Sequence, residues 1–329
     1  PLYDYGLSVL EQYGLSAVRS WRGRGALLCQ TQNGLVMIRE FNGSETKLKY
    51  QRALLQKIQE SRICRTDYLF PTLEGDLVAR DKDGAAYTLR RWYEGRECDT
   101  KSREDILRSV RALADLHKGM RLEFQENYAA RSQREEYQRH NRELRKIQKF
   151  IRKKKAENDF EKMYALSARW FLEKAAEATE RLENSGYREL LEESRKQGCI
   201  CHGEFNQHNV LFTENGIAVT NFEHWCYDIQ MADLYRFMRK ILEKYNWNLE
   251  LAQEMVTAYQ ERKEITRGEM ENLKLRFQYP EKYWKLANYY FSHKKIWISE
   301  KNVEKLRILV RQREVWEDFG EKCFKKFLF

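Results

Sequence analysis

Hydrophobic and polar positions alternate along the first hundred residues in the manner of a small antiparallel sheet. Five short runs are predicted to be strands: residues 17–21, 26–31, 35–41, 76–80 and 85–92. Asn33-Gly34 joins the second run to the third, because this dipeptide accepts the positive φ of a hairpin turn. Between the two groups of strands the spacing changes to that of a helix, which is predicted to begin after Ser44 as its N-cap and to end near Glu60.

Helical spacing dominates from Thr100 onward. Apolar residues recur at three- or four-residue steps up to Gly119, and long charged stretches without proline continue to about Lys196. A second hairpin pattern, within residues 199–223, turns at Asn215-Gly216, and helical sequence resumes from about Met231. The sequence therefore predicts an α+β protein. Its β-rich region with one helix covers residues 1–94, and a larger, mainly helical region covers residues 95–329.

Composition supports a folded protein rich in helices. Of 329 residues, 42% are hydrophobic, too many for a chain that stays unfolded for lack of apolar surface. Only three prolines occur, where average usage of about 5% would give roughly sixteen. The seven cysteines are scattered and odd in number, so they are expected to be free thiols. Neither a secretory signal nor an apolar run of membrane-spanning length is visible, which predicts synthesis in the cytoplasm and no membrane span.

The net charge of +10 is concentrated in one segment. Residues 131–155 contain eleven Lys and Arg and three Glu, a local excess of eight positive charges. Tyr137, Leu144 and Ile147 recur there at helical spacing, so one side can pack while the other stays cationic. This helix is either an ordinary solvated face or a surface for an acidic partner. No base-reading motif accompanies it, and nucleic-acid binding is therefore not the expected function.

The candidate chemistry lies around the second hairpin. If its turn is centred on Asn215 and Gly216, Asn209 falls opposite Phe222, and the side chains of Asn209, Asn221 and Glu223 gather at the open end. Glu204 lies five residues before Asn209, in the preceding loop. A carboxylate that accepts a hydroxyl proton, beside several oxygen ligands for Mg²⁺, is the arrangement that phosphoryl transfer requires.

These motifs resemble known families. His202-Gly203-Glu204-x4-Asn209 followed by Asn221-Phe222-Glu223 resembles the HGDxxxxN and D-F-E motifs of aminoglycoside phosphotransferases and choline kinases, which have the protein-kinase-like fold. Residues 94–99, 217–223 and 233–240 further resemble the CotS family of bacterial spore coat proteins, and the similarity covers nearly the whole chain. The resemblance implies a two-lobed fold, with the lobes at residues 1–94 and 95–329 and the catalytic-loop hairpin at 199–223.

The resemblance also assigns roles. Glu204 matches the catalytic base, and His202 belongs to the same catalytic loop, where hydrogen bonding to the backbone is its alternative role. The positions that match metal ligands are Asn209, Asn221 and Glu223. Arg39 matches the phosphate-holding lysine. Three residues at the seam between the lobes match positions that hold a nucleotide, with strand packing as their alternative role: Arg91, Trp92 and Tyr93. ATP and Mg²⁺ are the implied cofactors.

Three of these positions depart from the family pattern. Glu204 and Asn221 stand where aspartates are expected, and Arg39 stands in place of lysine. Loss of a carboxylate at Asn221 removes about 4 kcal/mol of attraction to a cation about 4 Å away, at an effective dielectric near 20. We therefore expect a spore coat-associated pseudokinase that binds a nucleotide or acts as a scaffold, with coat proteins or another acidic partner on the basic helix. The alternative is an active ATP- and Mg²⁺-dependent phosphotransferase that acts on a hydroxyl of a small molecule or coat component.

Overall fold

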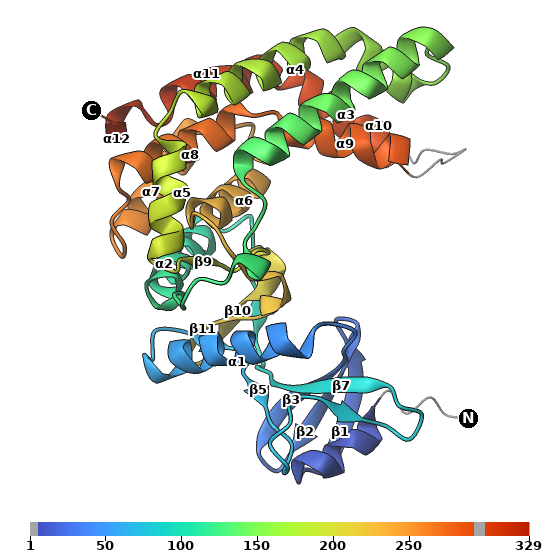
Figure 1. Ribbon diagram of the computed structural model, residues 1–329, viewed down its shortest axis with the longest axis vertical. Coiled ribbons are helices and arrows are strands. Elements are labelled where there is room, and N and C mark those ends of the chain that lie inside the picture. The colour runs from blue at the N-terminus through green and yellow to red at the C-terminus, as the bar shows by residue number, and fades with distance from the viewer. Residues whose placement is uncertain (1–5, 293–299, 329) are drawn as a thin grey trace. The chain divides into compact units, whose positions relative to one another are not determined.

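The N-terminal strands form one antiparallel sheet (Figure 1). The computed structural model describes residues 6–292 and 300–328. Five strands follow one another across the sheet: β1 (Ala17–Gly23), β2 (Ala26–Thr31), β3 (Gly34–Glu40), β7 (Ala86–Arg91) and β5 (Leu69–Phe70). A sixth, β6 (Ala79–Arg80), pairs with β7. The small antiparallel sheet predicted from the alternation is confirmed.

Both faces of this sheet are covered by apolar side chains, as the near-continuous hydrophobic runs of its strands require. Leu27 and Ile38 belong to a buried cluster that includes residues of the short helix η1 (Leu7–Tyr13). Leu28 and Met37, next to them in the sequence, belong to a second cluster that also contains Trp92. The single helix α1 (Glu45–Glu60) begins at the predicted N-cap, since the Ser44 hydroxyl accepts a hydrogen bond from the Lys47 N–H.

The hairpin near the candidate chemistry lies in a second, four-stranded sheet. The strand order is β4 (Arg65–Thr66), β11 (Gly216–Val219), β10 (Val210–Thr213) and β8 (Arg96–Glu97). The predicted register of the hairpin is wrong by two residues, because Val210 pairs with Val219 and Thr213 with Gly216. The turn is formed by Glu214 and Asn215, and the positive φ of Gly216 (109°) falls at the first residue of β11. Asn209 therefore lies beside Thr220, whose N–H donates to its carbonyl oxygen at 2.9 Å.

The chain divides into two compact units. The first contains residues 1–128, 198–227 and 258–263, and so holds all three sheets, α1 and α2 (Arg103–Gly119). The third sheet pairs β12 (Cys226–Tyr227) with β9 (Ile200–Cys201). The division expected between residues 94 and 95 stays a prediction, since the contacts group the chain along other lines.

The second unit is helical. Its longest helices are α3 (Gln133–Lys154) and α4 (Asp159–Glu183), which pack against each other and against α9 (Glu281–Ser292) and α10 (Glu300–Arg311) through one buried apolar cluster. The remaining helices of this half of the chain are α5 (Tyr187–Lys196), α6 (Met231–Leu242), α7 (Leu249–Gln260), α8 (Arg267–Gln278), α11 (Arg313–Lys322) and α12 (Lys325–Leu328). The mainly helical C-terminal region is confirmed.

Two further expectations concern the whole chain. All seven cysteines are free. Among the described residues, none of the helices is both long and apolar enough to cross a membrane.

Candidate functional site

The loop between β9 and β10 is fixed by its glycine and its first histidine. Gly203 has a φ of 81°, and a Cβ atom there would lie 1.9 Å from the carbonyl oxygen of His224, so no larger residue fits. The His202 ring is fully buried; its Nε2 lies 3.0 Å from the Thr220 carbonyl oxygen, and its Nδ1 accepts from the Glu204 N–H at 3.2 Å. These contacts fit the alternative role of His202, that of holding the loop backbone.

Glu204 presents its carboxylate at the surface of this loop. Its side chain is 43% exposed, and its carbonyl oxygen accepts hydrogen bonds from the side-chain amides of Asn206 and Asn209, each at 2.9 Å. The backbone is therefore anchored while the carboxylate stays accessible. One carboxylate oxygen, Oε2, accepts a hydrogen bond from Asn221 Nδ2 at 3.0 Å and lies 3.5 Å from His224 Nε2.

Asn221 is held in an unusual conformation at the end of the hairpin. Its φ of 69° and ψ of 56° are left-handed, a region that Asn tolerates better than most residues. Its N–H donates to Asp67 Oδ2 at 2.9 Å, and its side-chain oxygen accepts from Arg39 Nη1 at 3.2 Å. The amide group of Asn221 thus joins the guanidinium of Arg39 to the carboxylate of Glu204.

Besides Glu204, two arginines and two further carboxylates surround Asn221. Arg39 Nη1 lies 2.9 Å from Glu223 Oε1, and Arg90 Nη2 lies 3.5 Å from the same oxygen. Arg90 and Asp67 are both about 2% exposed and are 3.3 Å apart. Burial raises the pKa of Asp67 to about 6, although Arg90 and the Asn221 N–H act in the opposite direction. The cluster joins strands β3 and β7 of the first sheet to the segment that follows β11.

The donor set of this cluster does not fit a magnesium ion. Mg²⁺ needs oxygen ligands at about 2.0–2.1 Å in octahedral geometry. Here Asn221 Oδ1 and Glu223 Oε1 both face the Arg39 guanidinium, and the Asn209 amide donates to a backbone carbonyl. Across residues 6–292 and 300–328, three or more His, Cys, Asp or Glu side chains nowhere gather as metal ligands would. A fixed cation takes the place between the side chains that were expected to hold a metal.

The three seam residues predicted to hold a nucleotide have contacts within the protein. Arg91 donates to the carbonyl oxygen of Asn33 at 2.8 Å, and the Tyr93 hydroxyl donates to that of Thr66 at 2.9 Å. Trp92 is 8% exposed and belongs to the apolar cluster that includes Leu211 of the second sheet. Of the predicted site residues, the structure therefore brings together Arg39, Glu204, Asn221 and Glu223, and places Arg91 and Tyr93 against other parts of the backbone.

The turn between β1 and β2 contacts the loop that joins β9 to β10. Arg24 donates to the His208 carbonyl oxygen at 2.5 Å and pairs with Glu97, which also contacts the His208 ring. The Arg24 guanidinium lies over the Trp92 ring, 5.5 Å from its centroid. In protein kinases the corresponding turn is a glycine-rich loop that covers the phosphates of the bound nucleotide, and it must be free to do so. In this protein its tip is bonded to the second sheet.

Sequence reasoning missed Asp67 as a site residue, and it placed Arg90 at the seam beside Arg91 without assigning it an acidic partner. Asp67 lies in the short connection between β4 and β5, where no family motif marks it. Arg90 follows three buried residues of β7, Tyr87, Thr88 and Leu89, and a charged residue in such a run signals a buried partner. That signal could have found Arg90, but not the residue with which it pairs.

The fold has counterparts among solved phosphotransferases. The chain matches an aminoglycoside phosphotransferase from Alicyclobacillus acidocaldarius subsp. acidocaldarius DSM 446 with a TM-score of 0.86 at 18% identity, over 98% of this chain and 95% of that one. Choline kinase from Cryptosporidium parvum Iowa II matches with a TM-score of 0.54 at 13% identity, over 96% and 93%. Spectinomycin phosphotransferase APH(9)-Ia, solved with ADP and spectinomycin, matches with 0.53 at 14%, over 98% of both chains. The protein thus has the protein-kinase-like fold of small-molecule phosphotransferases.

The family follows from the sequence match. Residues 7–323 match the family described as "Spore coat putative kinase YutH", and the chain belongs to this family. The expectation of a CotS-like spore coat protein with a kinase-like fold is confirmed.

Proposed function

We propose that this protein is a pseudokinase of the spore coat, in which a fixed guanidinium replaces the metal of an active phosphotransferase. The observation that carries the proposal is the position of Arg39, within hydrogen-bond distance of both Asn221 and Glu223. In active protein kinases the corresponding positions bind Mg²⁺ through an aspartate and hold the phosphates with a lysine. Arginine is not equivalent to lysine there, because its charge is spread over a planar guanidinium; in this chain one nitrogen of that group, Nη1, contacts both Asn221 and Glu223.

The remaining residues support the same proposal. The Asn221 side-chain amide donates a hydrogen bond to the Glu204 carboxylate, a contact that an ionised aspartate in place of Asn221 could not make. The Glu204 carboxylate is therefore engaged by a neutral group rather than directed at a metal-bound substrate. Arg24, at the tip of the β1–β2 turn, is held by Glu97 and the His208 backbone, away from the role of a phosphate cover.

Nucleotide binding is the part of this proposal that is inherited from the fold. Spectinomycin phosphotransferase was solved with ADP, and an amicoumacin kinase of similar fold with AMP-PNP and Ca²⁺. In this chain Trp92 packs with Met37 and Leu211, apolar side chains from both sheets, where an adenine ring would need space. We therefore propose that any ATP binding is weak and does not depend on Mg²⁺, so that the main role of the fold is that of a scaffold in the coat.

One observation favours the alternative of an active phosphotransferase. The Glu204 side chain is 43% exposed on an anchored backbone, which is the state that a general base needs in order to reach an acceptor hydroxyl.

Thermal unfolding with ATP, in the presence and absence of Mg²⁺, together with an ATPase assay, tests the proposal. We expect the shift in melting temperature to be small and unchanged by Mg²⁺, and no turnover above that of the Glu204→Gln variant. The matched control is Glu214→Gln, which removes an exposed carboxylate from the β10–β11 turn. Mg²⁺-dependent turnover of the natural protein that Glu204→Gln abolishes and Glu214→Gln leaves intact would establish the active enzyme instead.

A further inference from the structure

The cationic part of α3 presents a continuous stripe of unpaired charge. Six residues form it, and we name them the α3 stripe: Arg142, Arg145, Lys146, Lys149, Arg152 and Lys153. They follow one another mostly at three- or four-residue steps, which places them on one side of a helix, over about 16 Å at 1.5 Å per residue. All six are exposed, and none forms an ion pair with another described residue.

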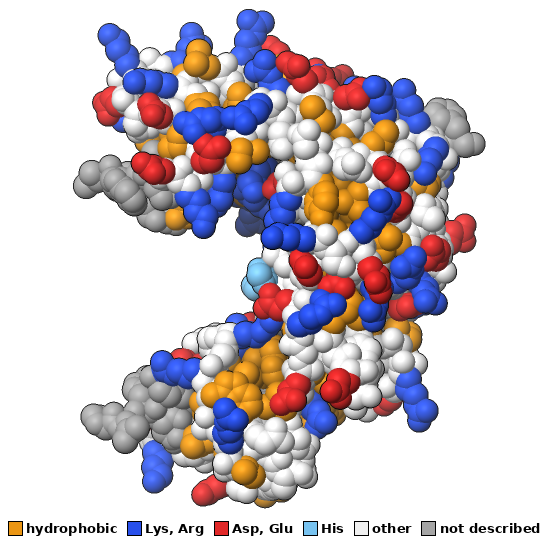
Figure 2. Space-filling view, turned by 180° about the vertical axis from the view of Figure 1, so that it is seen from behind, with side chains coloured by type: hydrophobic (Ala, Val, Ile, Leu, Met, Phe, Trp, Pro, Cys, Tyr) orange, Lys and Arg blue, Asp and Glu red, His pale blue; other side chains and the backbone are white. Residues whose placement is uncertain are grey.

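The stripe cannot turn inward, because the other side of α3 is fixed in the core. Leu144, Ile147 and Ile151 are at most 7% exposed and belong to the apolar cluster shared with α4, α9 and α10. Lys and Arg side chains elsewhere on the surface are interspersed with Asp and Glu, as Figure 2 shows for one face. Glu143 lies three residues before Lys146 on the helix, but its carboxylate pairs with Arg139 and not with a residue of the stripe.

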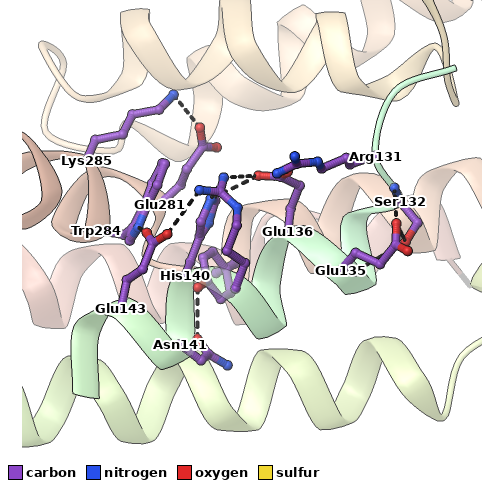
Figure 3. A network of polar contacts seen from close by, with 12 residues as sticks. Arg131, Ser132, Glu135, Glu136, His140, Asn141, Glu143, Glu281, Trp284 and Lys285 are labelled. Atoms are coloured by element: carbon purple, nitrogen blue, oxygen red, sulfur yellow. Dashed lines mark hydrogen bonds and ion pairs between the residues drawn. The ribbon is translucent and has the colours of Figure 1, made fainter. Parts of the chain in front are cut away.

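The carboxylates at both ends of the stripe have partners of their own. Towards the N-terminus of α3, Glu143 accepts a hydrogen bond from the Trp284 ring nitrogen at 2.6 Å, and Glu136 and Glu143 both pair with Arg139 (Figure 3). Beyond its C-terminus, Glu157 and Glu161 pair with Lys154 at 3.0 and 3.1 Å. The protein thus neutralises the flanks of the helix and leaves the stripe without counter-charge.

One apolar side chain lies beside these cations. Phe150 is 52% exposed; its ring meets the edge of Phe291, with the two ring centroids 5.9 Å apart, and the Lys154 Nζ lies 6.0 Å from the Phe150 centroid. Its place on α3 puts it at the edge of the stripe, one residue after Lys149. A partner that satisfies both features carries carboxylates together with an apolar residue.

We propose that the α3 stripe, with Phe150, binds an acidic segment of another protein. Carboxylates spaced at three or four residues along a helical partner would match the spacing of the cations. A phosphate backbone would leave Phe150 without an apolar contact, and a lipid surface would need more than one exposed apolar side chain. The inference concerns the second unit alone and does not depend on whether the kinase-like site is active.

A designed peptide tests the proposal directly. The probe is a helical peptide with Glu at every third or fourth position and one Leu, and its control has Gln in place of every Glu. We expect the natural protein to bind the Glu peptide at least tenfold more tightly than the Gln peptide, with an affinity that falls as salt rises.

Two variants of equal charge separate the stripe from net charge. The first changes all six residues of the α3 stripe to Gln. The second changes six exposed cations elsewhere in the helical unit to Gln: Lys162, Arg169, Arg188, Lys196, Lys301 and Lys305. We expect the stripe variant to lose at least tenfold in affinity for the Glu peptide and the control variant less than threefold. Equal losses in the two variants would overturn the proposal.

A single substitution provides a second test in case the variant with six changes does not fold. Phe150→Ser leaves the charge unchanged and removes only the apolar contact, so the affinity should fall several-fold while the salt dependence stays the same. Unchanged affinity in this variant would contradict the part of the proposal that assigns Phe150. Tighter binding of a DNA duplex or of anionic lipid vesicles than of the Glu peptide would refute an acidic protein segment as the partner.

Discussion

The residue at position 221 determines the net charge of the site, because it is a neutral Asn where an aspartate would be negative. Asn221 lies between the Glu204 carboxylate and the Arg39 guanidinium, and its N–H donates to Asp67. An aspartate there would add a fourth carboxylate to a cluster that has two guanidinium groups, and would lose the hydrogen bond to Glu204. The left-handed backbone is not an obstacle, because Asp tolerates that conformation about as well as Asn.

We expect Asn221→Asp to lower the free energy of unfolding by about 1 kcal/mol, the low end of the cost of an unmatched polar group, because Asn221 is only partly buried. Added Mg²⁺ should restore part of the loss, since the new carboxylate and Glu223 together favour a cation. Urea denaturation with and without Mg²⁺ measures both effects. Asn215→Asp, in the exposed hairpin turn, is the control for added charge. A variant as stable as the natural protein without Mg²⁺ would contradict the assigned role of the Asn221 amide.

Asp67 should give the protein a pH dependence of its own. Its pKa is about 6 when folded and 3.8 in its ordinary range, so the folded state binds the proton more tightly than the unfolded state. The resulting stabilisation is complete below about pH 4 and is lost as the pH rises through about 6; it amounts to at most about 3 kcal/mol. Asp67→Asn should remove this decline, and Asp83→Asn, in an exposed turn, should not.

His140 acts in the opposite direction over the same pH range. Burial lowers its pKa to about 4, so its neutral form stabilises the folded state above about pH 6.5, and that contribution is lost as the pH falls towards 4. The difference between natural protein and Asp67→Asn, measured by urea denaturation from pH 4 to 7, isolates Asp67 from this effect. A difference that does not vary with pH would rule out the assigned titration.

At the scale of elements, α3 depends on its first turn. Ser132 and Glu135 form a reciprocal cap: the Glu135 N–H donates to the Ser132 hydroxyl at 3.2 Å, and the Ser132 N–H donates to the Glu135 carboxylate at 3.1 Å (Figure 3). We expect Ser132→Ala to cost about 1 kcal/mol, and Ser132→Thr, which keeps the hydroxyl, to cost less. Hydrogen exchange in α3 is the measurement. Equal protection of α3 in the Ala and Thr variants would show that the cap is not needed.

Sequence patterns predicted the elements better than their pairing. The N-cap at Ser44 and the strands of the first sheet other than β5 follow from local spacing and turn chemistry, which the sequence displays directly. The predicted hairpin register was wrong because it requires Asn215 and Gly216 to be the two central residues of the turn. In the structure the central residues are Glu214 and Asn215, and Gly216 is the first residue of β11. The parallel pairing of β4 with β11 was not predicted, since it joins residues about 150 positions apart.

The same limit applies to the site. Arg39, Glu204, Asn221 and Glu223 could be identified because each occupies a place in a motif, and the structure brings these four together. Asp67 and the direction taken by Arg91 and Tyr93 could not be foreseen, because they depend on how one sheet meets another. Motifs identify residue types at a spacing; they do not show which atoms already have partners.

At the scale of the whole molecule, the first unit is assembled from distant parts of the chain. Residues 198–227, which carry Glu204 and Asn221, pack with residues 1–128. A cut at the predicted boundary would separate β11 from β4, and Asn221 from Asp67 and Arg39. The sequence order of lobes is therefore a poor guide to which residues fold together.

We expect a fragment of residues 95–329 to keep the protection of α3 and α4 but to lose it in residues 198–227. Hydrogen exchange of the fragment and of the full chain, compared segment by segment, measures this. Retained protection of the β10–β11 hairpin in the fragment would show that the second sheet is stable without β4.

Charge at this scale is also unevenly distributed. Eight of the ten net positive charges lie within residues 131–155, which leaves +2 for the other 304 residues. The isoelectric point of about 9.1 is therefore high mainly because of the charge on one helix, and not because the whole surface is basic.

The guanidinium of Arg39 has a property that a bound ion lacks: it is covalently attached to the chain. Its occupancy therefore does not vary with the supply of free ions. Chelators that empty a magnesium site would leave the pairing of Arg39 with Glu223 and Asn221 in place. The centre of this fold is therefore indifferent to ionic supply, and can keep one state through drying, dilution or sequestration of divalent cations.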